Sequence, residues 1–328
     1  MSAQTSTQTS TPVDVVVTGS RGKVGRAVVL ALHAAGHRVV GSDRLPPVFE
    51  RADEGAPTYV QADVTDAGDC YALLRHRPDA VVHCAAIPEP TQNPPHKVFA
   101  NNLLGVFNLS EAAVRMGVHR FVQMSSETVP GFFFPERPFL PQYAPVDEDH
   151  PIAPQDPYAL AKHLGEQVLD AVVRRSDVRC TSIRPSWVMH EGNYEGNLGP
   201  QVRDAAVLSP NLWSYIDVYD LADATRLAVE TDLPGHEVFY VASPDNAGGH
   251  DFAAVLHEHY GAQIALRDLE RPDSSGISCA KAQRLLGYRP TRSWRDYLDA
   301  EGRLLERWRA GGPVAGRAAT QPVHGSAG

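Results

Sequence analysis

The sequence predicts an α/β protein with a doubly wound parallel sheet, followed by a small C-terminal α/β lobe. Two observations carry this prediction. Short apolar runs rich in β-branched residues alternate with segments of helical periodicity over residues 13–183, and the first of these runs ends in a glycine-rich turn at 18–25. Parallel strands need crossover connections, so this alternation indicates βαβ units. We therefore expect a first domain at 13–183 and a smaller lobe at 184–310.

The elements follow one another along the chain. Predicted strands lie at 13–18, 38–42, 58–61, 80–83, 121–125 and 180–183, and the long helices of this domain lie at 98–116 and 158–175. The lobe should contain helices at 221–230, 252–260, 280–286 and 294–308 and a strand at 238–241, with one helix and one strand returning to the first domain. Residues 131–157, crowded with proline and aromatic residues, predict a long loop over a site. The polar end at 1–12 and the Gly/Ala-rich tail at 311–328 are expected to be disordered.

The amino-acid composition disfavours several classes of binding partner. The formal net charge of −9 disfavours a general nucleic-acid binder or a protein of anionic membranes, because both usually need a basic face. No apolar run is long enough to span a membrane, and no charged-then-apolar leader opens the chain. The four cysteines form no CxxC pair, so we predict neither a metal site nor a disulfide framework. These features predict a soluble, cytoplasmic protein with a small-molecule partner.

The first turn carries three glycines, Gly19, Gly22 and Gly25, in the spacing GxxGxxG. Glycine permits a tight turn and close approach of the backbone to a diphosphate, and the following helix offers its free N–H groups to the phosphates. Placed between a first strand and a first helix, the turn predicts a Rossmann-type dinucleotide-binding domain. The other cofactor-binding residues expected within the turn are Arg21, Lys23 and Val24.

Asp43 ends the second predicted strand, where a carboxylate can accept hydrogen bonds from the adenosine ribose. It would repel the 2′-phosphate of NADP, whereas Arg21 and Arg44 could bind that phosphate. We favour NAD over NADP. After the third and fourth strands, Asp63-Val64 could hold the adenine and Ala85-Ala86 could leave room for the cofactor backbone, although such positions are often simple strand ends.

Tyr158 and Lys162 are four residues apart and share one face of a predicted helix. An unperturbed tyrosine, with a pKa of about 10, is a poor proton acceptor near neutral pH, and a neighbouring ammonium should lower that pKa. Ser126, just after a predicted strand, can orient a substrate oxygen at the carboxyl edge of the sheet. These three residues are the predicted catalytic group for hydride transfer to or from a secondary alcohol. Tyr158 and Lys162 are also expected to bind the cofactor, because Lys162 can bond the nicotinamide ribose.

Together these motifs resemble the extended short-chain dehydrogenase/reductases, the NAD-dependent epimerase/dehydratase family. The resemblance covers about residues 13–297. It is carried by TGSRGKVG, Asp43, Asp63-Val64, HCAA at 83–86, NNLLGVFN at 101–108, SSETV at 125–129, YALAK at 158–162, Arg184-Pro185 and YIDVYDLADA at 215–224. It implies Ser126, Tyr158 and Lys162 as a triad, Asn102 as a supporting polar residue and Pro185 beside the nicotinamide. It also implies a homodimer through the helices at 98–116 and 158–175.

The chain differs from that family in residues that are expected to contact the substrate. The slots for the acid and the base of sugar dehydratases hold Glu127 and Thr128, so the base is missing. Trp213 stands where nucleotide-sugar enzymes usually place an arginine, and the segment 184–215 is short, as in the uronate dehydrogenases, which this chain also resembles in part. Residues that could line the substrate pocket, with core packing or a solvated loop as the alternative for most of them, are Glu127, Phe132 to Phe134, Arg184, Trp187, His190 and Trp213.

Three functions remain open at this point. The leading hypothesis is an NAD-dependent dehydrogenase or reductase acting on a sugar or sugar-like molecule, with Tyr158 as acid and base. The alternative is a sugar or nucleotide-sugar epimerase that keeps its NAD tightly bound. A non-catalytic dinucleotide sensor is the third, but such proteins commonly lose the tyrosine or the lysine, and this chain has both.

Overall fold

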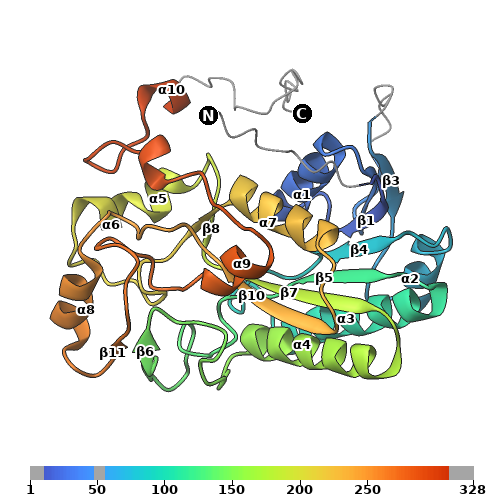
Figure 1. The fold of residues 1–328 in the computed structure, drawn as a ribbon, viewed down its shortest axis with the longest axis horizontal. Coiled ribbons are helices and arrows are strands. Elements are labelled where there is room, and N and C mark those ends of the chain that lie inside the picture. Colours follow the sequence, from blue (N-terminus) through green and yellow to red (C-terminus); the bar gives the residue numbers. More distant parts are fainter. Residues whose placement is uncertain (1–10, 48–55, 310–328) are drawn as a thin grey trace, which may run out of the picture.

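A parallel sheet of seven strands runs through the centre of the molecule (Figure 1). This computed structural model describes residues 11–47 and 56–309. The strand order is β10-β7-β5-β4-β1-β2-β3, so the chain winds outward in one direction from β1 and in the other from β4. The strands are β1 (Asp14–Thr18), β2 (Arg38–Asp43), β3 (Thr58–Gln61), β4 (Ala80–His83), β5 (Arg120–Met124), β7 (Arg179–Pro185) and β10 (His236–Val241). The predicted doubly wound fold is confirmed.

Helices cover both faces of this sheet. One face carries α1 (Lys23–Ala34) and α7 (Val218–Glu230), which pack against each other, and the other carries α2 (Ala67–Leu73), α3 (Pro95–Met116) and α4 (Pro157–Arg175). Successive strand residues point to opposite faces. In β1, Val15 and Val17 therefore join the core beneath α1 and α7, whereas Val16 joins the core beneath α2, α3 and α4.

The smaller lobe gathers beyond the carboxyl ends of the strands. It contains two short parallel pairs, β6 with β11 and β8 with β9. Its elements are β6 (Tyr143–Ala144), β8 (Val188–Met189), α5 (Tyr194–Asn197), α6 (Gly199–Arg203), β9 (Ile216–Asp217), α8 (Phe252–Tyr260), β11 (Ala265–Leu266) and α9 (Ala280–Leu285). Between them the chain returns twice to the main body, because α7 packs on α1 and β10 pairs with β7.

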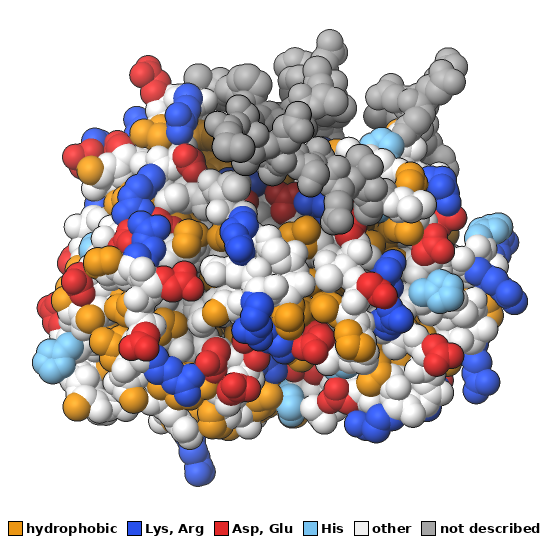
Figure 2. All heavy atoms as spheres, viewed as in Figure 1, with side chains coloured by type: hydrophobic (Ala, Val, Ile, Leu, Met, Phe, Trp, Pro, Cys, Tyr) orange, Lys and Arg blue, Asp and Glu red, His pale blue; other side chains and the backbone are white. Residues whose placement is uncertain are grey.

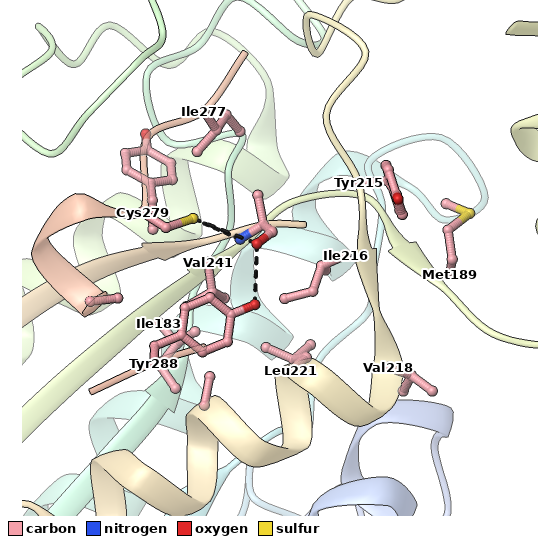
Figure 3. Packing of buried hydrophobic residues seen from close by; sticks show 14 of the residues in the cluster. Ile183, Met189, Tyr215, Ile216, Val218, Leu221, Val241, Ile277, Cys279 and Tyr288 are labelled. Atoms are coloured by element: carbon pink, nitrogen blue, oxygen red, sulfur yellow. Dashed lines mark hydrogen bonds between the residues drawn. The ribbon is translucent and has the colours of Figure 1, made fainter. Parts of the chain in front are cut away.

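One apolar cluster continues from the sheet into the lobe (Figure 3). Ile183 and Val241 enter it from neighbouring strands, Leu221 from α7 and Tyr288 from the lobe. The Tyr288 hydroxyl donates to the carbonyl oxygen of Ala242 at 3.2 Å, just after β10. The edge of the sheet and the lobe therefore share a core, which positions the lobe over the ends of the strands.

The prediction of one helix over 294–308 is wrong. The structure has a 3-10 turn at Trp294–Asp296 and a short α10 at Glu306–Arg309. Between them the chain reverses, with a bridge that joins Leu298 to Leu304. Gly302 adopts a left-handed φ of +66°, which breaks a right-handed helix. Tyr297 stacks on Tyr194 with ring centroids 3.9 Å apart, so packing against the lobe outweighs the local helical pattern.

The segment 131–157 contains no helix before α4 begins at Pro157, but it is anchored along the sheet edge and the lobe. Its strand β6 pairs with β11, and the Glu148 carboxylate accepts the backbone N–H of Tyr240 in the edge strand β10 at 2.7 Å. Phe132 and Phe133 are buried and stacked, with centroids 4.3 Å apart. The segment is therefore part of the packed body.

Acidic and basic side chains are interspersed over the face shown in Figure 2. Within the described ranges, no helix has the length and apolar character needed to cross a bilayer. The disorder predicted for 1–12 and 311–328 concerns residues that, apart from the last two of the first stretch, lie outside the described part of the chain.

Candidate active site

The glycine-rich turn has a geometry that only glycine allows at two positions. Gly19 has a φ of +68°, and a Cβ there would lie 2.7 Å from the backbone nitrogen of Ala85. A Cβ on Gly25 would collide with the carbonyl oxygen of Gly19. The N-cap residue of α1, Gly22, supplies no side-chain acceptor, so the first N–H groups of the helix stay available to a ligand. A side chain at Gly19 or Gly25 would therefore fill the space that the turn leaves open.

A cavity of about 160 Å³ opens beside this turn, at the point between β1 and β4 where the strand order reverses. Eight of the predicted cofactor residues line it, namely Gly19, Gly22, Asp43, Arg44, Asp63, Val64, Ala85 and Ala86. Sequence reasoning missed Thr18, Ser42, Ala62, Cys84, Ile87 and Asn101. Most of these stand at or next to the carboxyl ends of strands. Open α/β sheets bind ligands at these ends, and the same argument that predicted Asp63 and Ala85 would have predicted these residues too.

Asp43 lies close to the turn. Its carboxylate accepts the backbone N–H groups of Arg21 and Leu45, both at 3.3 Å. The Arg21 guanidinium instead lies over the ring of Tyr59, 4.6 Å from the centroid. Asp63 turns toward its own loop, where it accepts the N–H of Thr65 at 2.9 Å. The acidic group best placed at the end of β2 for ribose hydroxyls is therefore Asp43.

Asn102 and Lys23, predicted near the cofactor, do not line the cavity beside the turn. Asn102 is buried in α3, and its side chain bonds both backbone groups of Ile87, at 2.8 Å and 3.0 Å, which fixes the segment that follows β4. The Lys23 side chain reaches His190 in the lobe. Of the other predicted residues, Val24 and Gly25 belong to the first turn of α1, and Pro185 ends β7.

Ser126, Tyr158 and Lys162 are all buried where β5 ends and α4 begins. Asp156 caps α4 by accepting the N–H groups of Tyr158 and Ala159, both at 2.9 Å, which fixes the start of the helix. Lys162 donates from Nζ to the carbonyl oxygen of Met124 at 2.6 Å, and this Nζ lies 5.6 Å from the centroid of the Tyr158 ring. The backbone at the end of β5 thus holds the ammonium beside the phenol.

Burial dominates the electrostatics of this group. It raises the pKa of Tyr158 to about 12, an effect that a hydrogen bond with Ser126 opposes and the charge of Glu127 reinforces. Burial also lowers the pKa of Lys162 to about 8, against the attraction of Cys84 and Glu166. The lowered tyrosine pKa expected from the sequence does not appear here, because desolvation of the phenolate prevails. Near neutral pH the structure holds Tyr158 as a phenol.

Glu127 is a buried carboxyl group directly beside Ser126. Its Oε2 is 2.6 Å from the Oγ of Ser186, and its N–H donates to the carbonyl oxygen of Pro185 at 3.1 Å. Burial raises the pKa of Glu127 to about 8, although hydrogen bonds from Ser186 and Asn211 oppose the shift. The carboxyl group is therefore mostly protonated at pH 7. Sequence reasoning did not identify Ser186 and Asn211, which come from separate segments.

Arg184 and Trp213 are both buried and bonded to partners within the protein. Arg184 forms a buried bidentate ion pair with Glu166, at 2.9 Å and 2.7 Å. Trp213 is fully buried, and its Nε1 donates to the carbonyl oxygen of Val207 at 2.9 Å. Arg184 is held by this ion pair and Trp213 by core packing, so we remove both from the candidate substrate pocket. Trp187 keeps 38% of its surface exposed and remains a candidate.

Comparisons with known proteins show the family to which the chain is similar. The model of the NAD-dependent epimerase/dehydratase family matches residues 15–242. The UDP-glucose 4-epimerase of Rhizobium meliloti is 28% identical over 259 residues, 68% of this chain and 74% of the relative. The UDP-glucose 4-epimerase of Bacillus subtilis is 26% identical and matches 90% of this chain and 96% of its own.

Solved structures with a similar fold include two dehydrogenases or relatives of dehydrogenases. A short-chain dehydrogenase/reductase superfamily protein from Agrobacterium tumefaciens with bound NAD has a TM-score of 0.63 and 25% identity, over 86% of this chain and 94% of its own. A mutated uronate dehydrogenase has a TM-score of 0.60 and 22% identity, over 86% of this chain and 84% of its own, a likeness of fold alone.

Proposed function

The chain belongs to the NAD-dependent epimerase/dehydratase family, and from this we propose that it transfers a hydride between NAD and a secondary alcohol or carbonyl of a sugar-like small molecule. The observation that carries the proposal is the placement of Tyr158 and Lys162 beside Ser126, with the ammonium fixed at the end of β5. This group stands at the same carboxyl edge of the sheet as the glycine-lined cavity.

The residues around the cavity fit a dinucleotide. Gly19 and Gly25 keep a space that a Cβ would fill, and the uncapped start of α1 offers N–H groups to the diphosphate. Asp43 would accept hydrogen bonds from the adenosine ribose, which favours NAD over NADP. When bound, the nicotinamide would accept or supply the hydride.

The chain itself handles the proton. In the reductive direction the Tyr158 phenol donates its proton to the carbonyl oxygen of the substrate as the carbon gains a hydride. In the oxidative direction Tyr158 must first lose its own proton, because the structure holds it as a phenol near neutral pH. Its phenolate would then take the hydroxyl proton as the carbon loses a hydride, and the positive charge of Lys162 would help to stabilise that phenolate. Ser126 orients the substrate oxygen by hydrogen bonding. Such a positioned acid or base typically contributes about 10² to 10⁴ to the rate.

The substrate we propose carries no nucleotide. Trp213 offers no charge to a diphosphate, and its single N–H is already used. Arg203, which could reach phosphates from another loop, donates to the carbonyl oxygen of Glu301 at 3.3 Å. A free sugar or sugar acid needs neither a nucleotide pocket nor a diphosphate clamp.

The second candidate function is a sugar epimerase that retains its NAD. It is favoured by the relatives named UDP-glucose 4-epimerase, which match up to 90% of this chain. A panel of sugars and sugar acids incubated with free NAD separates the two candidates. A dehydrogenase reduces free NAD as substrate is consumed, whereas an epimerase converts its substrate with no net reduction of free NAD. Mass spectrometry of the purified protein would show whether NAD stays bound.

We also propose a homodimer formed through α3 and α4. Three large apolar side chains on these helices are exposed, Leu104 at 45%, Phe107 at 47% and Leu160 at 37%. A second copy of the chain would cover them, in the arrangement that the family resemblance implies. Light scattering of the purified protein tests this proposal, and a monomer at micromolar concentration would contradict it. The free cysteines at 70, 84, 180 and 279 suit a reducing compartment, so we propose the cytoplasm.

A further inference from the structure

A buried ion pair connects α4 to three strands of the sheet. The Glu166 carboxylate accepts hydrogen bonds from Nε and Nη2 of Arg184, at 2.9 Å and 2.7 Å, and from the hydroxyl of Ser125 at 2.7 Å. The side chains of Glu166 and Arg184 keep only 4% and 3% of their surface exposed. Arg184 lies in β7 and donates from Nη1 to the hydroxyl of Tyr240 in β10 at 3.4 Å, and Ser125 directly follows β5. One carboxylate therefore joins α4 to the ends of neighbouring strands.

Stability alone is a weak reason for such a pair. Removing two charges from water costs free energy that their attraction often does not repay, and an apolar pair of similar volume is commonly as stable. The location of the pair indicates a different role. Glu166 stands one turn of α4 after Lys162, and its partner Ser125 directly precedes Ser126. The pair thus adjoins two members of the catalytic group.

Glu166 places a negative charge close to the Lys162 ammonium. Residues four apart on a helix share one face, with Cβ atoms about 5–6 Å apart. Lys162 is 5% exposed, and its Nζ donates to the neutral carbonyl oxygen of Met124. A neutral acceptor does not balance a full charge that has been removed from water. The opposite charge that offsets the burial of Lys162 comes from Glu166.

The other titratable groups around Lys162 carry no negative charge near neutral pH. Burial raises the pKa of the Tyr158 phenol and of the Cys84 thiol to about 12, so neither is ionised. Burial lowers the pKa of His83 to about 3, with the charge of Lys162 acting in the same direction, so that ring is neutral. Burial lowers the pKa of Lys162 itself to about 8, against Cys84 and Glu166. Since the Cys84 thiol is uncharged, the attraction that remains is that of Glu166.

We propose that Glu166 is a positioning residue for hydride transfer, which keeps the Lys162 ammonium charged and ties α4 to β5 and β7. The inference rests on the proposed function, in which this ammonium stabilises the Tyr158 phenolate and binds the nicotinamide ribose. Glu166 acts through Lys162. Arg184 acts through Glu166 in turn, because a bidentate bond fixes the orientation of the carboxylate.

Carbon-13 NMR of the lysine side chains tests the effect on charge directly. The chain has lysines at 23, 97, 162 and 281, so a protein labelled at lysine Cε gives few signals, and Lys162→Met identifies the signal of Lys162. This signal should titrate near pH 8 in the wild type. In Glu166→Gln it should titrate at lower pH, because the lost negative charge no longer favours the ammonium.

Glu230→Gln is the matched control. Glu230 also pairs with an arginine, Arg226, at 2.6 Å, but it lies on α7, which covers the opposite face of the sheet. This variant should leave the titration of Lys162 unchanged. An equal Lys162 pKa in the wild type and in Glu166→Gln would overturn the proposal, whatever happens to thermal stability.

A double variant separates the effect on charge from a loss of folding. Glu166→Gln leaves Arg184 buried and unpaired, which lowers stability, whereas Glu166→Gln combined with Arg184→Met removes both charges and places an apolar side chain in the core. The double variant should show the same fall in the Lys162 pKa. A wild-type Lys162 pKa in the double variant would contradict the proposal, because the charge of Glu166 would then have no influence on the ammonium.

The pH dependence of NAD binding gives a readout that a purely structural role would not move. At about pH 6 Lys162 is charged in both proteins, so Glu166→Gln should bind NAD as tightly as the wild type. At about pH 9 it should bind about tenfold more weakly, the factor that one pKa unit carries. An equal loss of affinity at every pH would indicate damaged folding and overturn the positioning role. If the Lys162 pKa falls as expected but the wild type binds no NAD, the proposed function fails and the effect of Glu166 on Lys162 stands.

Discussion

Lys162 donates a hydrogen bond of 2.6 Å from Nζ to the carbonyl oxygen of Met124, the last residue of β5. This bond links α4 to the end of β5, two residues before Ser126. It holds the ammonium 5.6 Å from the centroid of the Tyr158 ring. Since burial lowers the pKa of Lys162 to about 8, this acceptor also helps to keep the buried group charged at pH 7.

Lys162→Ala should therefore reduce both the rate and the affinity for the cofactor, because one ammonium would serve the phenolate and the nicotinamide ribose. Steady-state kinetics together with NAD titration of the variant measure the two effects separately. A loss of rate with unchanged NAD affinity would contradict the ribose contact.

Glu127 should make stability depend on pH. Its folded pKa is raised from the usual 4.5 to about 8, so the folded state holds a proton that the unfolded chain releases. This contribution to stability is present below pH 4.5 and is lost as the pH rises toward 8, by up to about 1 kcal/mol per pH unit within that window. Denaturant unfolding of the wild type and of Glu127→Gln between these pH values tests whether stability falls as the pH rises. Parallel pH profiles of the two proteins would contradict the burial argument.

Asp43 should determine the preference for NAD. Titration of both cofactors against the cofactor-free protein should show tighter binding of NAD, and Asp43→Asn should narrow the difference by removing the repulsion of a 2′-phosphate. Tighter NADP binding by the wild type would mean that Arg21 and Arg44 outweigh the carboxylate.

Nucleotides should bind weakly. Calorimetry with UDP, dTDP and GDP measures this directly, because any nucleotide-sugar enzyme needs affinity for the diphosphate and the base. Dissociation constants in the low micromolar range for any of the three would contradict the proposed substrate class and favour the epimerase.

The sequence was most informative where the local signal and the tertiary structure agree. The apolar, β-branched runs became the central strands, since a strand covered on both faces needs apolar residues throughout. The i, i+4 spacing placed Tyr158 and Lys162 on one side of α4. The helix predicted at 294–308 failed because Gly302 reverses the chain and Tyr297 packs on Tyr194.

Side-chain direction at the substrate side was harder to predict. Arg184 and Pro185 are neighbours in β7, so they face opposite sides of the sheet. Arg184 turns toward Glu166, a partner 18 residues earlier whose role no local pattern revealed. Trp213 stands where related enzymes usually place a substrate-binding arginine, but its side chain is buried in the core. Ser186 and Asn211 reach Glu127 from separate segments, a juxtaposition set by the packing of the lobe.

We propose Tyr158 as the acid and base of the hydride transfer. The most direct measurement follows reduction of free NAD by the wild type and by Tyr158→Phe, side by side, over a panel of free sugars and sugar acids. We expect the wild type to reduce NAD with at least one of them, and the variant to bind NAD normally while turnover falls by about 10² to 10⁴. A variant that keeps more than a tenth of the wild-type rate, or a wild type that converts its sugar without reducing any free NAD, would contradict the account.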